Sequence, residues 1–138
     1  MNFSRSIESA APPERVWAVM SDVERWPEWT PSVTSVELLG AGPLTLGSKA
    51  RIRQPKLRPA VWKVTEISDH RFAWKTGGAL LWVIGRHWVD ATGEGSRANL
   101  SLQFGGILGG LVSWLTRDLN RRYLSMESEG LKRRSERR

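Results

Sequence analysis

Polar and apolar side chains alternate at the start of the chain and again in several runs through its middle. Alternation with a period of two places one set of side chains on each face of a strand. The pattern predicts strands over residues 2–8, 33–39, 48–54, 61–67, 71–76, 80–90 and 97–104. Turn-forming segments such as Gly77-Gly78 separate these runs. Short strands joined by turns are typical of an antiparallel meander.

Two helical pieces are expected between the first two strands. Pro12 and Pro13 suit a helix entrance, because proline is tolerated in the first turn of a helix. The apolar residues that follow them continue this first helix. A second short helical piece is predicted over residues 22–29, and Pro31 ends it.

The pattern of apolar residues in the last part of the chain predicts one long amphipathic helix, from about Leu108 to Glu136. Its apolar residues are spaced by three and four, as on one helix face: Leu108, Leu111 or Val112, Leu115, Leu119, Tyr123 and Met126. A single helix that follows antiparallel strands can bury such a stripe only by lying across their sheet. We therefore predict an α+β fold, a single domain over residues 1–138, in which a curved antiparallel sheet of six or seven strands wraps around the helix and leaves a hollow.

Charge is unevenly distributed along the chain, whose net charge is +7. Residues 49–63 contain six cations and no acid, and the basic tail over residues 132–138 is a candidate for disorder. Such clusters can contact phosphates or an anionic surface. Because no nucleic-acid motif accompanies them, we favour a solvated helix end and sheet face, and we expect no specific nucleic-acid partner. Weak binding of the tail to an anionic surface stays open.

Several classes of chemistry are excluded or disfavoured by composition. The chain has no cysteine, so no disulfide, thiol nucleophile or thiolate metal site can form. Two separated histidines, His70 and His87, disfavour a zinc site, and no phosphate-binding glycine loop is present. We expect neither a metal nor a cofactor. Residues 1–11 lack a secretory pattern and no apolar run could span a bilayer, so we expect a cytoplasmic protein, either a monomer or a homodimer.

Several segments together carry a family resemblance: residues 13–17 (PERVW), 22–29 (DVERWPEW), 47–51 (GSKAR), 54–56 (QPK), 62–67 (WKVTEI), 72–74 (FAW), 85–88 (GRHW) and 123–134 (YLSMESEGLKRR). Their order resembles the START-like superfamily, also called SRPBCC, and within it the small bacterial proteins labelled polyketide cyclase/dehydrase-like. The resemblance covers nearly the whole chain and implies the helix-grip fold, with two short helices after the first strand. Family members include lipid carriers, hormone receptors and a minority of aromatic polyketide cyclases. The resemblance therefore implies hydrophobic ligand binding or lipid transport. It implies no set of catalytic residues common to the whole family.

His87 is the candidate for acid–base chemistry. It shares a strand face with Leu81, Val83 and Val89. This face is more apolar than the one that holds Arg86, so we expect it to point inward. An inward histidine beside a cavity can move a proton or orient a ligand carbonyl. A core histidine bonded to a polar neighbour explains the pattern equally well.

Polar residues on the neighbouring strands are weaker candidates. Gln54 shares the expected inner face with Ile52 and either hydrogen-bonds a ligand or marks the end of its strand. Glu66 would have a raised pKa if it were buried, but a bulge would turn it to solvent, which we favour. Arg51 and Arg53 lie on the opposite face from Ile52, so we expect them to point outward.

Tryptophan is abundant, with eight residues in the chain. Those of the helical pair should hold it against the sheet: Trp17, Trp26 and Trp29. Strand tryptophans that face the hollow either form a flat aromatic lining for planar or hydrophobic ligands, or fill the hollow and leave no pocket. Both interpretations apply to Trp62 and Trp74. Trp82 and Trp88 lie on the face opposite His87 and are less suited to lining.

Three functions remain in competition. The leading one is binding of a small hydrophobic or aromatic ligand between the sheet and the C-terminal helix, by Ile52, Gln54, Trp62, Val64, Trp74, Val83, His87, Leu102, Phe104, Leu115, Leu119 and Tyr123. The alternative is a polyketide cyclase/dehydratase-type enzyme, in which confinement folds a reactive chain and His87 moves a proton. No catalytic motif is evident, so the sequence leaves enzymatic activity open. The third is a partner- or membrane-facing module that uses the basic helix end.

Overall fold

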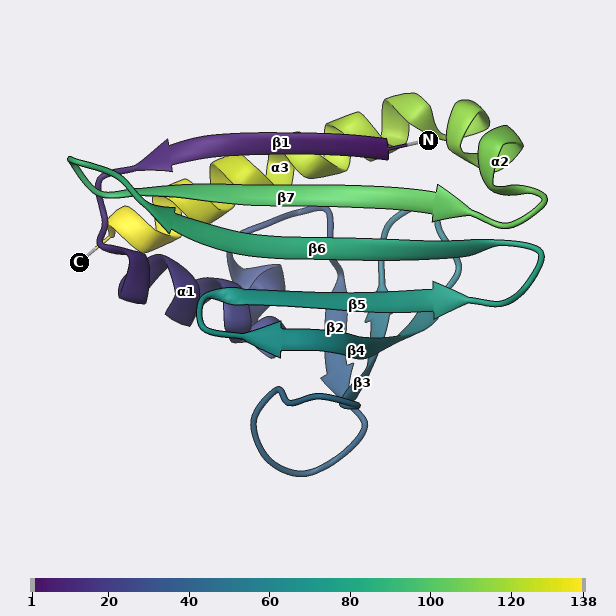
Figure 1. Cartoon of the computed structure of the whole chain (residues 1–138), viewed down its shortest axis with the longest axis horizontal. Coiled ribbons are helices and arrows are strands. Elements are labelled where there is room, and N and C mark those ends of the chain that lie inside the picture. The colour runs from purple at the N-terminus through teal and green to yellow at the C-terminus, as the bar shows by residue number, and fades with distance from the viewer. Residues whose placement is uncertain (1, 138) are drawn as a thin grey trace.

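The computed structural model describes residues 2–137 and contains a seven-stranded antiparallel sheet in the order β1-β7-β6-β5-β4-β3-β2 (Figure 1). The strands are β1 (Asn2–Ser9), β2 (Ser35–Leu38), β3 (Lys49–Arg53), β4 (Ala60–Ser68), β5 (Arg71–Gly77), β6 (Trp82–Ala91) and β7 (Ser96–Gly105). The sheet is a meander from β2 to β7, and β1 pairs with β7. The predicted α+β helix-grip fold is confirmed.

Two short helices connect β1 to β2 and cover one end of the sheet. They are α1 (Pro13–Ser21) and the 3-10 helix η1 (Val23–Glu28). Proline occupies the first position of α1, as predicted, where its missing N–H costs no intrahelical hydrogen bond. Figure 1 shows α1 beside the C-terminal end of the last helix, so the connection closes the hollow at that end.

The C-terminal helix is divided into α2 (Gly109–Leu115) and α3 (Arg117–Glu136). Thr116 separates them, with φ −105° and ψ 12°, and its hydroxyl donates to the carbonyl oxygen of Val112 at 2.7 Å. A threonine that bonds back to the preceding turn is a known cause of helix bending. The prediction of one uninterrupted helix from Leu108 is therefore wrong over its first turns, while the long helix itself is present as α3.

The buried face of these helices also differs from the predicted stripe. Leu111 and Leu115 are mostly exposed. Of the predicted stripe, Val112 and Tyr123 do line the cavity. The other side chains that face the sheet or the hollow are Thr116, Asn120, Leu124, Glu127 and Leu131. Polar residues occupy part of the inner face, and the predicted positions Leu111 and Leu115 lie outside it.

The basic C-terminal segment continues α3 as far as Glu136. Lys132 pairs with Glu136 at 2.8 Å between nitrogen and oxygen, and Arg134 pairs with a glutamate of η1. The disorder considered for residues 132–138 therefore does not apply to residues 132–136. Arg138 lies outside the described residues.

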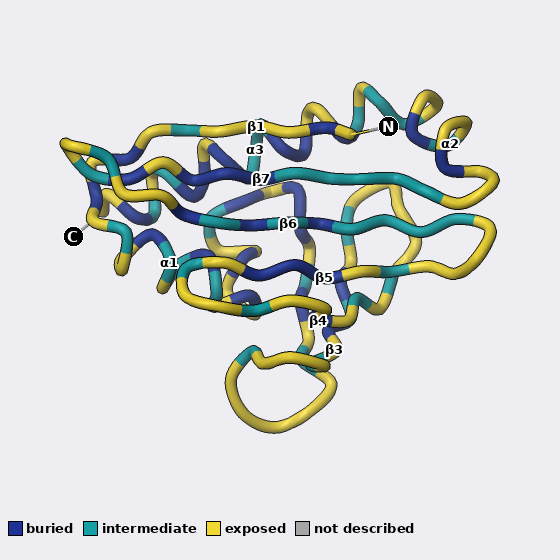
Figure 2. The backbone as a smooth tube through the Cα atoms, viewed as in Figure 1, coloured by how far each residue is buried: buried dark blue, intermediate teal, exposed yellow. Residues whose placement is uncertain are grey.

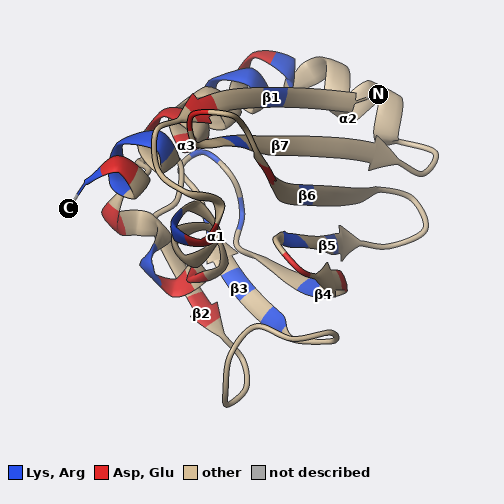
Figure 3. Cartoon of the chain, turned by 60° about the vertical axis from the view of Figure 1, so that its left-hand side comes forward, with Lys and Arg blue, Asp and Glu red and all other residues tan. Residues whose placement is uncertain are grey.

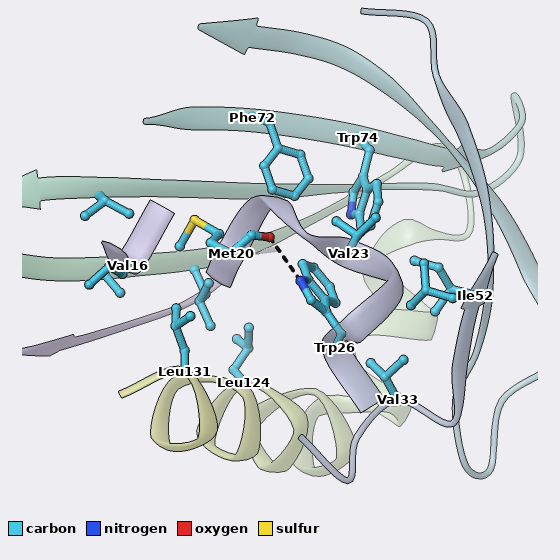
Figure 4. Packing of buried hydrophobic residues seen from close by; sticks show 14 of the residues in the cluster. Val16, Met20, Val23, Trp26, Val33, Ile52, Phe72, Trp74, Leu124 and Leu131 are labelled. Atoms are coloured by element: carbon cyan, nitrogen blue, oxygen red, sulfur yellow. Dashed lines mark hydrogen bonds between the residues drawn. The ribbon is translucent and has the colours of Figure 1, made fainter. Parts of the chain in front are cut away.

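The hydrophobic core fills the end of the fold near α1 (Figures 2 and 4). Its most deeply buried apolar side chains are Val16, Met20, Val23, Val64, Phe72 and Leu131. Trp26 fixes η1 by donating its indole N–H to the carbonyl oxygen of Met20 at 3.0 Å (Figure 4). Gly130 lets α3 approach closely, because a Cβ there would overlap the carbonyl oxygen of Trp29. This close packing is confined to one end, and the other end of the hollow stays open.

Candidate functional site

A cavity of about 260 Å³ lies between the sheet and the inner face of α2 and α3. Its walls come from β3 to β7, from both helices and from the loop over residues 54–60. Most of the lining is apolar: Trp26, Val33, Ile52, Leu57, Ala60, Trp62, Trp74, Leu81, Val83, Gly85, Leu102, Phe104, Val112 and Leu124. The polar lining residues are Gln54, Arg58, Thr76, His87, Thr116, Asn120, Tyr123 and Glu127. An apolar wall with a few convergent polar groups is typical of a small-molecule site.

Most residues predicted to contact a ligand surround this cavity: Ile52, Gln54, Trp62, Trp74, Val83, His87, Leu102, Phe104 and Tyr123. Three lie elsewhere. Val64 is fully buried within the core cluster. Leu115 is 63% exposed, and Leu119 lies off the lining because the inner face of the helices passes through Thr116 and Asn120.

Indole rings line the hollow and do not fill it. Trp62 and Trp74 lie with ring centroids 6.0 Å apart, and Trp74 reaches Trp26 of η1 at 5.3 Å. These three rings form a continuous aromatic wall on one side of the cavity. Trp82 and Trp88 lie on the opposite face of the sheet, where cations of β5 cover their rings.

His87 points inward, as expected from the strand pattern, but it is packed among aromatic rings. Its ring stacks on Phe72 with centroids 4.5 Å apart and planes 7° apart, and Trp26 lies at 5.3 Å. Within residues 2–137, its buried Nδ1 has no hydrogen-bond partner. Burial lowers the pKa of His87 to about 3, so the imidazole is neutral at pH 7. A neutral ring can orient a ligand but does not supply the proton of an imidazolium.

A hydrogen-bonded polar cluster forms one end of the cavity. Ser32, in the segment after η1, donates from its hydroxyl to a carboxylate oxygen of Glu127 at 3.2 Å. The same hydroxyl lies 2.7 Å from that of Thr30. Gln54 donates from its side-chain amide to the carbonyl oxygen of Ser32 at 3.2 Å. Gln54 is therefore held by the backbone at the cavity wall.

Glu127 is the candidate that the sequence analysis missed. Burial raises the pKa of Glu127 to about 7, and the hydrogen bond from Ser32 opposes this only in part. None of the salt bridges of the described chain includes this carboxyl group. Its charge therefore changes close to neutral pH. The available signal was helical spacing, since Glu127 lies four residues after Tyr123 and three after Leu124 on one face.

Two further polar side chains of the inner helix face line the cavity, Tyr123 and Asn120. Tyr123 is buried and donates its hydroxyl to the carbonyl oxygen of Pro55, which ties α3 to the loop over residues 54–60. Asn120 donates its side-chain amide to the hydroxyl of Thr116 at 3.0 Å. Both side chains add hydrogen-bonding atoms to an otherwise apolar wall.

The remaining polar candidates lie outside the cavity. The register of β4 against β5 shifts between Val64 and Glu66, and Glu66 is exposed, as favoured above. Arg51 pairs with Glu37 at 3.0 Å, and Arg53 is exposed. The two arginines therefore lie on the outer side of β3, away from the cavity.

Residues 2–137 contain no group of three or more His, Asp or Glu side chains arranged to hold a metal. His70 pairs with its neighbour Asp69 in the turn between β4 and β5, at 3.0 Å. None of the helices that the structure describes has both the length and the apolar character needed to cross a bilayer.

The fold is shared with solved structures of low sequence identity. The crystal structure of TTHA0849 from Thermus thermophilus is 21% identical, with a TM-score of 0.77 over 98% of this chain and 97% of that chain. The solution structure of the KanY protein is 20% identical, with a TM-score of 0.78 over 99% and 98%. The crystal structure of Ara h 8.0201 is 15% identical, with a TM-score of 0.68 over 95% and 97%. No curated protein matches the chain.

A family model supplies the assignment that structural likeness alone does not. The model described as polyketide cyclase / dehydrase and lipid transport matches residues 1–136. This range includes every strand, the cavity walls and all of α3. The resemblance to the START-like (SRPBCC) superfamily is confirmed, and the chain belongs to the polyketide cyclase / dehydrase and lipid transport family.

Proposed function

We propose that the protein binds a small hydrophobic or aromatic molecule in the cavity between the sheet and the α2–α3 face. The observation that supports this function best is the lining itself. Three indole rings and a set of aliphatic side chains converge on a space that the core leaves unfilled. Burial of apolar ligand surface against such a wall is favourable without any catalytic group.

The size of the cavity narrows the class of ligand. Its volume of about 260 Å³ lies just below the range of roughly 300–1,000 Å³ known for pockets of drug-sized ligands. An apolar cavity of about 150 Å³ is already large enough for benzene. A compact ring system therefore fits this space better than a lipid with two long acyl chains.

Polar groups at the wall would orient such a ligand. Glu127 and Asn120 on α3 and Gln54 on the facing side place hydrogen-bonding atoms around the cavity. Among the lining residues of the described chain, Glu127 and Arg58 are the ionic side chains, and Arg58 is exposed. An uncharged ligand with one hydroxyl or carbonyl group matches this arrangement.

Two neighbouring positions on β6 give a direct test of binding. Val83 lines the cavity, whereas Ile84 lies on the opposite face of the same strand. Val83→Trp should fill the space and abolish the fluorescence increase of the neutral probe N-phenyl-1-naphthylamine. Ile84→Trp adds the same ring outside the cavity and should leave it intact. Equal probe binding by both variants would refute the proposal. If the two variants differ as expected, native mass spectrometry of protein purified from its own host would identify a retained molecule.

A cyclase- or dehydratase-type enzyme is the second candidate, and Glu127 is the observation that favours it. Aldol closure and loss of water both require that a proton be removed and another returned. A carboxyl group with a pKa of about 7 can do both near neutral pH, whereas a neutral His87 is suited to orient a carbonyl. Glu127→Gln should abolish turnover of a polyketone chain while probe affinity stays within a few-fold. Parallel loss of turnover and affinity would leave only a binding role.

A further inference from the structure

The mouth of the cavity is formed by three segments that lie far apart in sequence: the loop over residues 54–60, the turn over residues 76–81, and residues 104–117. Leu57, Leu81 and Val112 come from these three segments and all line the cavity. The second and third segments are joined by a backbone hydrogen bond of 2.8 Å from Leu108 to Leu80. We call these three segments together the mouth surface.

The mouth surface exposes large apolar side chains. Their exposed fractions range from 41% to 83%, and they are Leu57, Leu80, Ile107, Leu108, Leu111, Trp114 and Leu115. Elsewhere in the described chain, the large apolar side chains of comparable exposure are Leu39, Leu46 and Val61. Exposed apolar side chains gathered at one end of a molecule mark an interaction site.

Local geometry explains why α2 exposes its apolar face. Gly106 adopts a positive φ of 85°, and a Cβ there would overlap the backbone of Leu80. Gly109 starts α2 directly against the backbone of Phe104. The glycines thus hold the backbone of α2 close to the end of β7, and the side chains of Leu111 and Trp114 are left outside.

Charge distinguishes the partner that fits this surface. The three segments contain Lys56, Arg58 and Arg117 and no acidic residue, and Figure 3 shows α2 free of charged residues. Arg117 lies over the Trp114 ring, with its guanidinium carbon 4.8 Å from the ring centroid. A second copy of this chain bound about a two-fold axis would place these cations against one another. An anionic lipid surface would instead meet both the cations and the apolar side chains.

We propose that the mouth surface docks on an anionic lipid bilayer, with the apolar side chains of α2 in the interface and the three cations at headgroup level. Trp114 and Arg117 then take the places that amphipathic side chains prefer at this boundary. In this orientation the cavity opens toward the membrane, where hydrophobic molecules accumulate. Docking itself does not depend on the proposed ligand. Only the inference that a ligand enters the cavity from the membrane rests on the proposed function.

Vesicle co-sedimentation tests the docking. The full chain should sediment with phosphatidylcholine–phosphatidylglycerol vesicles at low salt, less at moderate salt, and weakly with phosphatidylcholine alone. Arg58→Glu should reduce binding by more than the roughly fivefold expected for loss of one cation. Arg53→Glu, an equal charge change at an exposed position outside the mouth surface, should have a smaller effect. Equal losses in both variants would mean attraction by net charge alone and would overturn the proposal.

The apolar contribution has its own matched pair of variants. Ile107→Glu should weaken vesicle binding roughly tenfold or more. Leu46→Glu introduces the same side chain at a position that is 67% exposed but outside the mouth surface, so any loss there should follow from net charge alone. Circular dichroism should show both variants folded. An Ile107→Glu protein that binds vesicles as well as Leu46→Glu would exclude insertion of the apolar segment over residues 107–115.

Two further measurements separate the membrane from other occupants. Vesicles should shift the tryptophan emission of the wild type to shorter wavelength, and Trp114→Phe should remove most of that shift. Sedimentation velocity without lipid should show that the wild type and Ile107→Glu have the same oligomeric state. A wild-type dimer that Ile107→Glu dissociates is therefore not expected. A dimer of that kind, together with absence of vesicle binding, would assign the mouth surface to a second copy. Ile107→Glu should still bind N-phenyl-1-naphthylamine in the absence of lipid. This control distinguishes a failure of membrane docking from a failure of ligand binding.

Discussion

Ser32 and Glu127 are joined by a hydrogen bond of 3.2 Å at the polar end of the cavity. This bond connects the segment after η1 to the middle of α3, across a sequence separation of 95 residues. It is also the only hydrogen bond that the described structure gives to the Glu127 carboxyl group. The group is therefore held in place but incompletely satisfied when ionised, and its protonation affects both the stability and the binding properties of the fold.

The stability of the fold should decrease as Glu127 ionises. The pKa of Glu127 rises from 4.5 to about 7 on folding, so the folded state binds its proton more tightly than the unfolded state. Stability from this group is complete below pH 4.5 and is lost as pH rises through 7. The loss should be on the order of 2 kcal/mol, allowing for the partial exposure of the side chain. Because His87 titrates in the opposite sense in every variant, urea denaturation should show the loss as a stability difference between the wild type and Glu127→Gln that changes between pH 5 and pH 8. Glu129→Gln, an exposed control, should keep the wild-type profile.

Ligand binding should carry the same pH dependence. Below pH 7 the carboxyl group of Glu127 is neutral, whereas above pH 7 it places a charge in an apolar wall, which an uncharged aromatic ligand does not compensate. Binding of N-phenyl-1-naphthylamine should therefore be severalfold tighter at pH 6 than at pH 8. Glu127→Gln should remove this difference. A pH profile that is unchanged in the variant would mean that another group controls binding.

His87 should destabilise the fold in acid. Its pKa falls from 6.5 to about 3 on folding because of burial, so the unfolded state binds the proton first. Stability is then lost as pH drops from about 6.5 toward 3. His87→Phe keeps an aromatic ring beside Phe72 and removes the titration. At pH 8 the variant should lie within about 1.5 kcal/mol of the wild type, and its relative stability should grow as the pH is lowered to 5.

Two glycines of the C-terminal helices should respond oppositely to the same substitution. Gly130→Ala places a methyl group against the carbonyl oxygen of Trp29 and should cost about 3 kcal/mol of unfolding free energy. Gly110→Ala meets no atom within 4 Å and should stabilise α2 by about 0.5–1 kcal/mol. Thermal unfolding of the two variants checks both signs. An unchanged unfolding free energy in Gly130→Ala would show that α3 can move away from η1.

The sequence predicted the sheet well because strand alternation and the turns depend on local residue order. The inward face of β6, with Val83 and His87, follows directly from that alternation. The helix face was harder to predict, because leucines outside the core, such as Leu115, are indistinguishable in sequence from buried ones. Glu127 was overlooked because a carboxyl group on an inner face contradicts the pattern from which that face is identified. Only the three-dimensional structure places it beside Ser32.

The uneven packing along α3 has a consequence for motion. Near Leu131 and Gly130 the helix is in close contact with the neighbouring segments, and backbone amides there should exchange with deuterium only through global unfolding. Toward Thr116 the same sheet is covered by a short helix with exposed side chains. Amides of α2 should exchange through low-energy openings. A ligand would then enter and leave the cavity beside α2 on the timescale of these local openings, while the rest of the molecule remains folded.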